Sequence, residues 1–221
     1  MTSPEFRDRL ARRARRAKAP LTLEMLEPLE AYFRLLAHWN AKINLTALPL
    51  EVPTDETFDR LLVEPLVAAR QIPTHDPSVW FDLGSGGGSP AIPLKIARQV
   101  LRLTMIESKE RKSAFLREAV RFLGLGETTV ETERFEVALA QSQRTATADV
   151  VTARAVRADE VLFEAAGKIL KGGGHLLLFR PAHSATVDPF GFKRVSTVPL
   201  MDSPPSFLSV YRRVFHVEQS G

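Results

Sequence analysis

The segment from Val79 to Pro90 constrains the fold of this chain more than any other. An apolar run ends in an acid, Asp82, and glycine then occupies four of the next six positions. Glycine has no Cβ, so it adopts backbone angles closed to other residues and lets a ligand approach the main chain. Ser89 can supply an N-cap oxygen, and Pro90 a first-turn residue that needs no N–H partner. We therefore predict a strand that turns sharply into a helix beside a ligand.

A second apolar run follows and ends in Glu107. At the end of a neighbouring parallel strand, such an acid is placed to bind a ribose. The glycine spacing departs from the dinucleotide fingerprint because Ser89 stands in place of its third glycine. Asp82 also adds negative charge where a pyrophosphate would bind. A cationic ligand suits Asp82 better, which favours S-adenosylmethionine (SAM) over a nicotinamide cofactor; a glycine turn without a ligand is the alternative.

Hydrophobic periodicity predicts alternating helices and strands after an N-terminal helical part. Helices are expected over residues 21–39, 58–71, 90–99, 109–123 and 158–170, with a loop over 40–48. Strands are expected over 79–83, 102–107, 128–132, 149–153, 175–179, 193–198 and 207–214, the last two as a hairpin. The chain is thus predicted to be an α/β protein in two parts: a basic tail with a helical cap over 1–76, and an α/β domain over 77–221.

Positive charge is concentrated at the N-terminus, although the net charge is only +4. Seven cations crowd the first eighteen residues, namely Arg7, Arg9, Arg12, Arg13, Arg15, Arg16 and Lys18. Such a segment suits the phosphate backbone of a nucleic acid, where each contact releases counterions. A solvated, partly disordered tail is the alternative.

Composition excludes several classes of protein. Cysteine is absent, which rules out a disulfide framework, a thiolate metal site and a cysteine nucleophile. The five histidines show no metal-binding spacing, so we expect no metal. No apolar run approaches the roughly 20 residues needed to span a bilayer, and no hydrophobic signal segment is visible. We expect a cytoplasmic protein without membrane contact, and a monomer because no heptad seam is visible.

Four segments, taken in order, resemble a known family. They are Asn44–Thr46, the glycine segment Asp82–Pro93, Glu107–Leu116 and Ala153–Ala155. Together they resemble the bacterial 16S rRNA guanine-N7 methyltransferase G family, also called the glucose-inhibited division protein B family. The resemblance implies a Rossmann-like SAM-dependent methyltransferase fold, with a mostly parallel seven-stranded sheet and a C-terminal antiparallel hairpin. It also implies methyl transfer to N7 of one guanine in 16S ribosomal RNA, either free or in the small ribosomal subunit.

The chain departs from the family pattern at several positions. Leu61 and Pro65 stand where the family usually has a histidine and a serine, on either side of the acid Glu64. Further departures are Gly87 for proline, Ala91 for glycine, and Arg180-Pro181 for Lys-Gly. The cofactor half of the predicted site is therefore better supported than the half that faces RNA.

The chemistry can be argued without the resemblance. Guanine N7 carries a lone pair and no proton, so its methylation needs no general base. The enzyme must align N7, the methyl carbon and the sulfonium sulfur, and exclude water. The chain lacks both the cysteine that cytosine-C5 methyltransferases need and the Asn/Asp-Pro-Pro-aromatic motif of amino-group methyltransferases. Both absences are consistent with N7 chemistry.

Cofactor-binding roles are hypotheses at this point. The candidates are Asp82, Gly84, Ser85, Gly86, Gly88, Glu107, Arg134, Phe135, Glu136 and Arg154. Backbone N–H groups of the glycines would bind the methionine carboxylate, Asp82 the ammonium group, and Glu107 both ribose hydroxyls. Residues 134–136, in the loop after the third strand, would flank the adenine, unless Phe135 belongs to the core.

Arg154 ends the fourth strand and is the predicted catalytic residue. It would donate to guanine O6 or hold a phosphate, unless a salt bridge with Asp82 or Glu64 engages it. The RNA-binding candidates are Arg12, Arg13, Arg16, Lys109, Arg111, Lys112 and Arg180, for which a solvated surface is the alternative. Asn44 and Thr46 are expected to order the site, unless they only cap their own loop.

Three functions remain open from the sequence. The basic N-terminus and the ordered motifs favour an rRNA methyltransferase. A SAM-dependent methyltransferase of a small molecule and a catalytically impaired RNA-binding or assembly protein are the alternatives. An NAD-linked oxidoreductase fits less well because the third glycine is missing.

Overall fold

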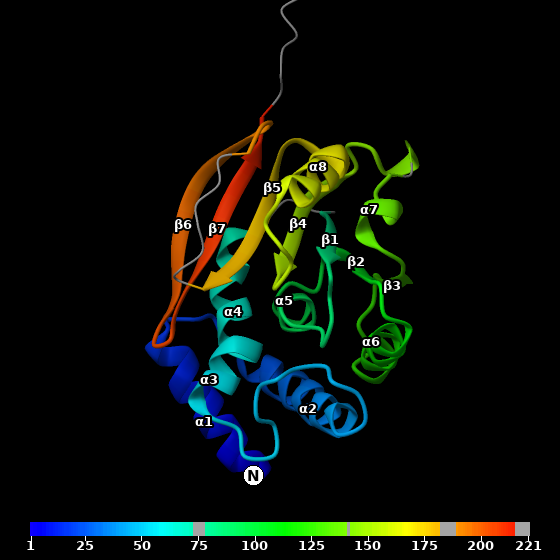
Figure 1. Ribbon diagram of the computed structural model, residues 1–221. Helices are drawn as coiled ribbons and strands as arrows, with labels where there is room; N and C mark the ends of the chain where they lie inside the picture. The colour runs from blue at the N-terminus through cyan, green and yellow to red at the C-terminus, as the bar shows by residue number, and fades with distance from the viewer. Residues whose placement is uncertain (73–77, 141, 182–188, 215–221) are drawn as a thin grey trace, which may run out of the picture.

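A twisted sheet of seven strands forms the centre of the protein (Figure 1). The computed structural model describes residues 1–72, 78–140, 142–181 and 189–214. The sheet contains β1 (Val79–Leu83), β2 (Arg102–Glu107), β3 (Thr128–Thr132), β4 (Ala148–Arg154), β5 (Leu170–Pro181), β6 (Phe192–Asp202) and β7 (Pro205–Arg213). Its order is β3-β2-β1-β4-β5-β7-β6, with β1 to β5 parallel and β6–β7 an antiparallel hairpin at the edge. The predicted α/β architecture is confirmed.

The strand order reverses between β1 and β4. The chain runs from β1 outward to β2 and β3, then returns to pair β4 with the other side of β1, with Leu83 opposite Ala153. In open parallel sheets, ligands bind outside the carboxyl ends of the strands at such a reversal. The glycine segment follows β1 and Arg154 ends β4, so both lie at this point.

Side chains that alternate along the strands divide the core into two layers. Val150 of β4 belongs to one buried cluster and Val151 to the other, as the period of two along a strand requires. The first cluster also takes residues from α1 (Ser3–Arg16), α2 (Leu23–Asn40), α5 (Ala91–Ala97) and α6 (Glu110–Phe122). The second takes residues from α7 (Phe135–Ala138) and α8 (Glu160–Ile169). The N-terminal helices therefore share a core with the sheet.

Residues 3–16 form a helix, so the partly disordered tail given as the alternative is wrong. Thr2 and Glu5 close a capping box at the start of α1. Phe6, Leu10 and Ala14 recur at helical spacing and are buried, with the Phe6 ring 5.1 Å from that of Phe58. This apolar stripe fixes α1 on the body of the protein. The predicted boundary at residue 76 lies outside the described residues, and the division into two parts stays a prediction.

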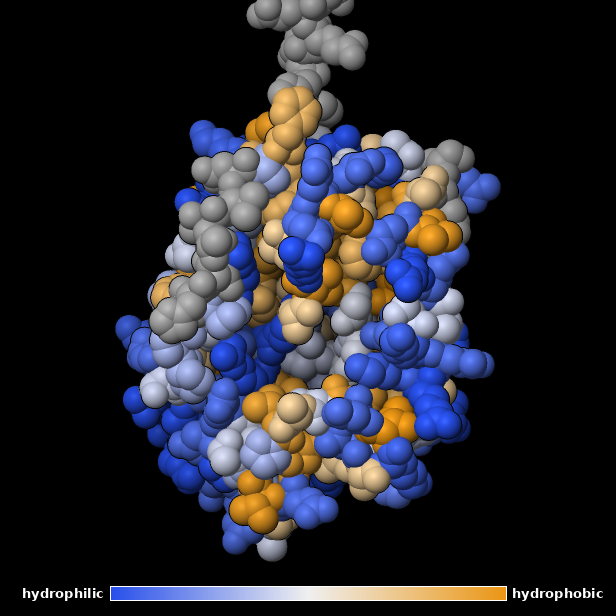
Figure 2. Space-filling view, viewed as in Figure 1, coloured by the Kyte–Doolittle hydropathy of each residue, from blue (hydrophilic) through white to orange (hydrophobic). Residues whose placement is uncertain are grey.

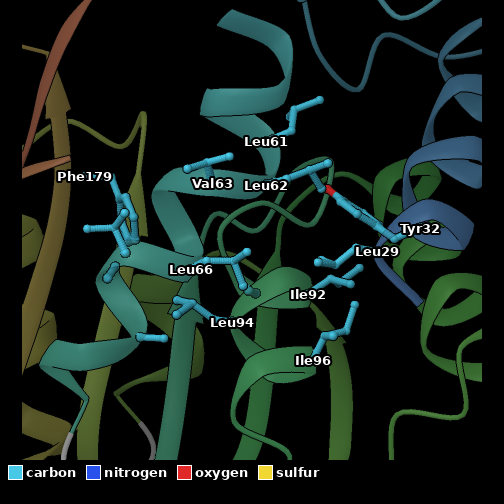
Figure 3. Packing of buried hydrophobic residues seen from close by; sticks show 14 of the residues in the cluster. Leu29, Tyr32, Leu61, Leu62, Val63, Leu66, Ile92, Leu94, Ile96 and Phe179 are labelled. Carbon is cyan, nitrogen blue, oxygen red and sulfur yellow. The ribbon is translucent and has the colours of Figure 1, made fainter. Parts of the chain in front are cut away.

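The helix predicted over 58–71 consists of several shorter segments. The helical region begins before residue 58 and runs through α3 (Asp55–Phe58), a π-helical turn (Asp59–Val63), α4 (Glu64–Ala68) and a 3₁₀ turn (Ala69–Gln71). Figure 3 shows Leu61, Leu62, Val63 and Leu66 of this region packed in the first cluster, beside Tyr32 and Leu29 of α2 and Ile92, Leu94 and Ile96 of α5. The π-helical turn was not predicted.

The remaining differences concern element ends. α5 begins at Ala91 with Pro90 as its N-cap residue, and no side chain caps it. The predicted N-cap role of Ser89 is therefore wrong. β5 begins at Leu170 rather than at the predicted residue 175 and includes Gly172, Gly173 and Gly174, because pairing with β4 starts at Ala148. In the described parts of the chain, no helix is long and apolar enough to cross a membrane.

Candidate active site

A cavity of about 690 Å³ opens at the carboxyl ends of β1, β2, β4 and β5. Figure 2 shows this face hollowed between the sheet and the N-terminal helices. The cavity falls in the size range of sites for small molecules and cofactors. Its lining comprises Leu36, Leu45, Thr46, Leu48, Arg60, Leu61, Gly84, Ser85, Gly86, Gly87, Ser89, Glu107, Lys112, Arg154, Ala155, Val156, Phe179, Arg180 and Pro181.

The glycine segment forms the floor of this cavity. Gly84 has a φ of +71°, and a Cβ there would lie 2.8 Å from Cγ2 of Val156. Gly88 has a φ of +86°, and a Cβ there would lie 2.5 Å from Cδ1 of Ile92. Both positions favour glycine, because a positive φ strains any other residue and an added Cβ would also displace these neighbouring side chains.

The amides of these glycines are already engaged. The Gly84 N–H donates to the carbonyl of Ile106 at 2.8 Å, and the Gly88 N–H to that of Ser85 at 2.7 Å. The Gly86 N–H donates to Oε2 of Glu107 at 2.9 Å. Each amide has one proton, so the predicted binding of a carboxylate by these three donors is wrong. Gly84 and Gly86 still line the cavity, whereas Gly88 shapes the turn behind it.

Glu107 stands at the end of β2 with its carboxylate held in place. Oε2 accepts from the Gly86 N–H, and Oε1 accepts from the Lys109 N–H at 2.8 Å. The residue is 6% exposed and lines the cavity. A carboxylate offers about four lone-pair sites. Each oxygen can therefore accept a further hydrogen bond from a ligand hydroxyl, and the ribose contact of Glu107 stays a prediction.

Asp82 lies buried beneath the glycine segment and does not line the cavity. Its Oδ1 accepts from the Thr152 hydroxyl, while Oδ2 has no hydrogen-bond partner among the described residues. Burial raises the pKa of Asp82 to about 6. A buried carboxyl with a vacant oxygen is suited to a cationic group or a water molecule.

Arg154 lines the cavity and forms a salt bridge with Glu64, one of the two partners that the sequence suggested as an alternative. Its Nη2 donates to Oε2 of Glu64 at 2.9 Å, and its Nη1 donates to the Arg60 carbonyl. The guanidinium lies 4.4 Å above the ring of Phe179. Glu64 is buried and also accepts from the Ser206 hydroxyl at 2.6 Å. These contacts fix the orientation of Arg154 at the cavity wall.

The N-terminal helices supply the opposite wall, which the sequence only partly indicated. Leu36 of α2 and Leu45 of the following loop line the cavity with Thr46. Asn40 orders this loop, since its Oδ1 accepts from the Leu45 N–H at 2.8 Å and from the Thr46 N–H at 2.9 Å. Asn44 is exposed and lies outside the cavity, so that half of the prediction is wrong.

Tyr32 joins the same wall to the glycine segment. It is fully buried, and its hydroxyl donates to the Gly87 carbonyl at 2.7 Å. A Cβ on Gly87 would lie 3.2 Å from the Leu45 carbonyl, so proline or another side chain would crowd the loop. Nothing in the sequence pattern distinguished Tyr32 from an ordinary core residue.

Residues 134–136 do not line the cavity. Arg134 is the N-cap residue of α7, and Glu136 is exposed. Phe135 is half-buried and packs against the second core cluster, which is the alternative stated for it. Phe135 and Glu136 lie in a short helix, which Arg134 precedes, rather than in the predicted loop. A contact with a bound adenine from these residues remains a prediction.

The predicted RNA-binding cations fall into three groups. Lys112 and Arg180 line the cavity together with Arg60, which the sequence analysis did not single out. Four of the predicted side chains are exposed on the surface, those of Arg12, Arg16, Lys109 and Arg111. Arg13 instead points to the π-helical turn, where its Nε donates to Oδ1 of the buried Asp59 at 2.8 Å. Arg13 is thus occupied in the fold, and its RNA-binding role is not supported.

Comparison with known proteins identifies the family. Residues 25–187 match the family rRNA small subunit methyltransferase G. A relative with that name from Stenotrophomonas maltophilia (strain K279a) is 36% identical over 189 residues, covering 83% of this chain and 84% of the relative. One from Bacillus pumilus (strain SAFR-032) is 33% identical over 173 residues, covering 78% and 71%. The chain belongs to the rRNA small subunit methyltransferase G family. The resemblance carried by its four segments is confirmed.

Solved structures show that the fold of this family member is shared by SAM-dependent enzymes. A SAM-dependent methyltransferase from Aquifex aeolicus superposes with a TM-score of 0.56 at 15% identity, covering 69% of this chain and 91% of that one. TYW2 of P. horikoshii, solved in complex with MeSAdo, superposes with a TM-score of 0.53 at 13% identity, covering 67% and 61%. The Rossmann-like methyltransferase fold is therefore confirmed.

Proposed function

We propose that this protein transfers a methyl group from SAM to N7 of a guanine in 16S ribosomal RNA. Membership of the rRNA small subunit methyltransferase G family supports the reaction and the class of RNA. The single observation that carries the proposal is the cavity at the reversal of strand order. It places the Glu107 carboxylate and the cations Arg154 and Arg180 around one space.

The residues present fit SAM. Glu107 retains lone pairs for two ribose hydroxyls, and the close backbone at Gly84 and Gly86 leaves room for a ligand above it. The unpartnered Oδ2 of the buried Asp82 suits an ammonium group that it reaches through a water molecule. Bound SAM would supply an electrophilic methyl group that the N7 lone pair takes without loss of a proton.

The protein's part in the reaction is to bind and orient the base. Arg154 is held by Glu64 and by the face of Phe179, so its remaining donor capacity is fixed in direction. A guanidinium can donate to guanine O6 and leave N7 free. Leu36, Leu45 and Leu61 form an apolar side of the cavity that excludes water when a base enters.

The target guanine would leave its stack to reach this cavity, which costs less in an RNA loop than in a duplex. Arg180 and Lys112 at the cavity, and the exposed cations of α1 and α6, are candidates for phosphate contacts. These contacts should make RNA binding strongly dependent on salt concentration. A methyltransferase of a neutral small molecule would show little such dependence.

Incubation with labelled SAM and unmodified small ribosomal subunits tests the proposal. Label is expected at N7 of one guanine, found by mapping of the modified nucleotide. Parallel reactions with naked 16S rRNA show which form is the substrate. Label at no guanine N7, with SAM still bound, would contradict the proposal and favour an RNA-binding or assembly protein.

A further inference from the structure

The π-helical turn between α3 and α4 precedes a proline and contributes to the cavity wall. Its defining hydrogen bond runs from the Glu64 N–H to the Asp59 carbonyl, five residues back. The next donor in the series would be residue 65. Pro65 has no N–H, so it cannot continue either a π-helical or an α-helical pattern. π-helical turns within helices occur frequently at functional sites.

Pro65 lacks the one amide that could compete for either of two carbonyls. In a π-helix the amide of residue 65 would donate to Arg60, and in an α-helix to Leu61. These two carbonyls accept from side chains of the cavity instead. The Ser89 hydroxyl donates to the Leu61 carbonyl at 2.9 Å, and Nη1 of Arg154 donates to the Arg60 carbonyl.

The two side chains also approach each other. Nη1 of Arg154 lies 3.5 Å from Oγ of Ser89, so the two carbonyls, the hydroxyl and the guanidinium form one connected set. Ser89 follows the glycine segment after β1, whereas Arg154 ends β4. The interrupted helix therefore ties together the two strands between which the order of the sheet reverses.

We propose that Pro65 is a positioning residue for the methyl transfer, because its missing N–H keeps the main chain from competing for the carbonyls of Arg60 and Leu61, which orient Arg154 and Ser89. The adjacent Glu64 completes the arrangement by accepting from Nη2 of Arg154. One short segment thus fixes both terminal nitrogens of the guanidinium. This proposal rests on the proposed function, in which Arg154 contacts the base.

Pro65→Ala restores the missing amide and is the direct test. The amide at position 65 should donate to the Leu61 carbonyl and compete with Ser89. We expect kcat on small ribosomal subunits to fall about five- to tenfold, the effect of one net hydrogen bond. The Kd for S-adenosylhomocysteine should stay within about twofold, since the cofactor half of the cavity is unchanged. Pro28→Ala, which restores an amide inside α2, is the matched control and should leave kcat unaltered.

A double-mutant cycle separates positioning from a general loss of packing. Ser89→Ala removes the hydroxyl that donates to the Leu61 carbonyl and should lower kcat by a similar factor. If both residues act through one arrangement, the double variant should be no slower than the slower single variant. Fully additive losses in kcat, or a Pro65→Ala enzyme with wild-type kcat, would overturn the proposal.

A crystal structure of the Pro65→Ala variant gives a readout independent of turnover. Contact of Arg154 with the Arg60 carbonyl should be lost and the helix should tighten to the α-helical pattern. Unchanged contacts in that structure would refute the positioning role even if activity fell. If the wild-type protein itself methylates no guanine N7, the proposed function fails, while this structural comparison still tests the arrangement.

Discussion

Replacing Asp82 by asparagine should stabilise the protein by an amount that grows with pH. Burial raises the pKa of Asp82 to about 6 from its ordinary value of 3.8, so the folded protein holds this proton more tightly than the unfolded chain. The contribution of Asp82 to the free energy of unfolding is then greatest at acidic pH. It declines as pH rises from about 4 to about 6, and stays low above that.

The size of the effect follows from the shift in pKa. About two units correspond to roughly 3 kcal/mol at pH 8, where the carboxylate is fully charged in both states. At pH 5 the penalty is about half of this, because the folded state is still mostly protonated. Asparagine keeps an oxygen for the Thr152 hydroxyl, so this contact largely cancels in the comparison. We therefore expect the stabilising effect of Asp82→Asn to be about 1–1.5 kcal/mol larger at pH 8 than at pH 5.

Urea denaturation of both proteins at pH 5 and pH 8 measures this difference. Any constant cost of the amide, such as the unpaired NH₂, is the same at both pH values and drops out. The same variant should bind SAM more weakly, because the ammonium group loses its counter-charge. A difference in the free energy of unfolding that does not change between pH 5 and pH 8 would refute the reasoning, since it would mean that Asp82 does not titrate in this range.

Four further substitutions test the site and the fold. Arg13→Ala should lower the free energy of unfolding by about 3 kcal/mol, because it leaves the buried Asp59 without its partner. Arg12→Ala should change stability little and weaken RNA binding, because Arg12 is exposed. Urea denaturation and filter binding measure the two effects, and equal behaviour of the two variants would contradict these roles. Glu107→Ala should weaken S-adenosylhomocysteine binding by about tenfold or more, and an unaltered Kd by calorimetry would contradict the ribose contact. Arg154→Ala should reduce kcat at least about tenfold with SAM affinity retained, and undiminished turnover would remove Arg154 from the mechanism.

The local sequence pattern was sufficient to predict the strands of the sheet and the order in which helices and strands alternate along the chain. The alternation of apolar runs and the four glycines after Asp82 lie within single elements, where periodicity and backbone freedom decide the outcome. For the same reason Glu107 was placed correctly at the cavity, since the end of a strand fixes where its side chain emerges. Arg154 was likewise placed correctly at the cavity, because it ends the predicted fourth strand.

Contacts between distant segments could not be predicted in this way. The sequence offered Asp82 and Glu64 equally as partners for Arg154, and the packing of α4 against the sheet decides for Glu64. Asn44 was preferred to Asn40 because it stands in a recognisable motif, yet the loop folds back so that Asn40 reaches its amides. Amides in the glycine segment were assigned to a ligand because their internal acceptors, such as the Ile106 carbonyl, belong to another strand.

The N-terminal charges show why composition alone misled. Arg9 and Arg13 are four residues apart and therefore share one face of α1, next to its buried stripe. On that face they meet carboxylates of α3 and the π-helical turn, and Arg9 donates to Oδ1 of Asp55 at 2.9 Å from its Nε. Arg12 and Arg16 are also four apart and lie on an exposed face. A basic segment that forms an amphipathic helix thus divides its cations between folding and binding, and only the exposed row is available to a phosphate backbone.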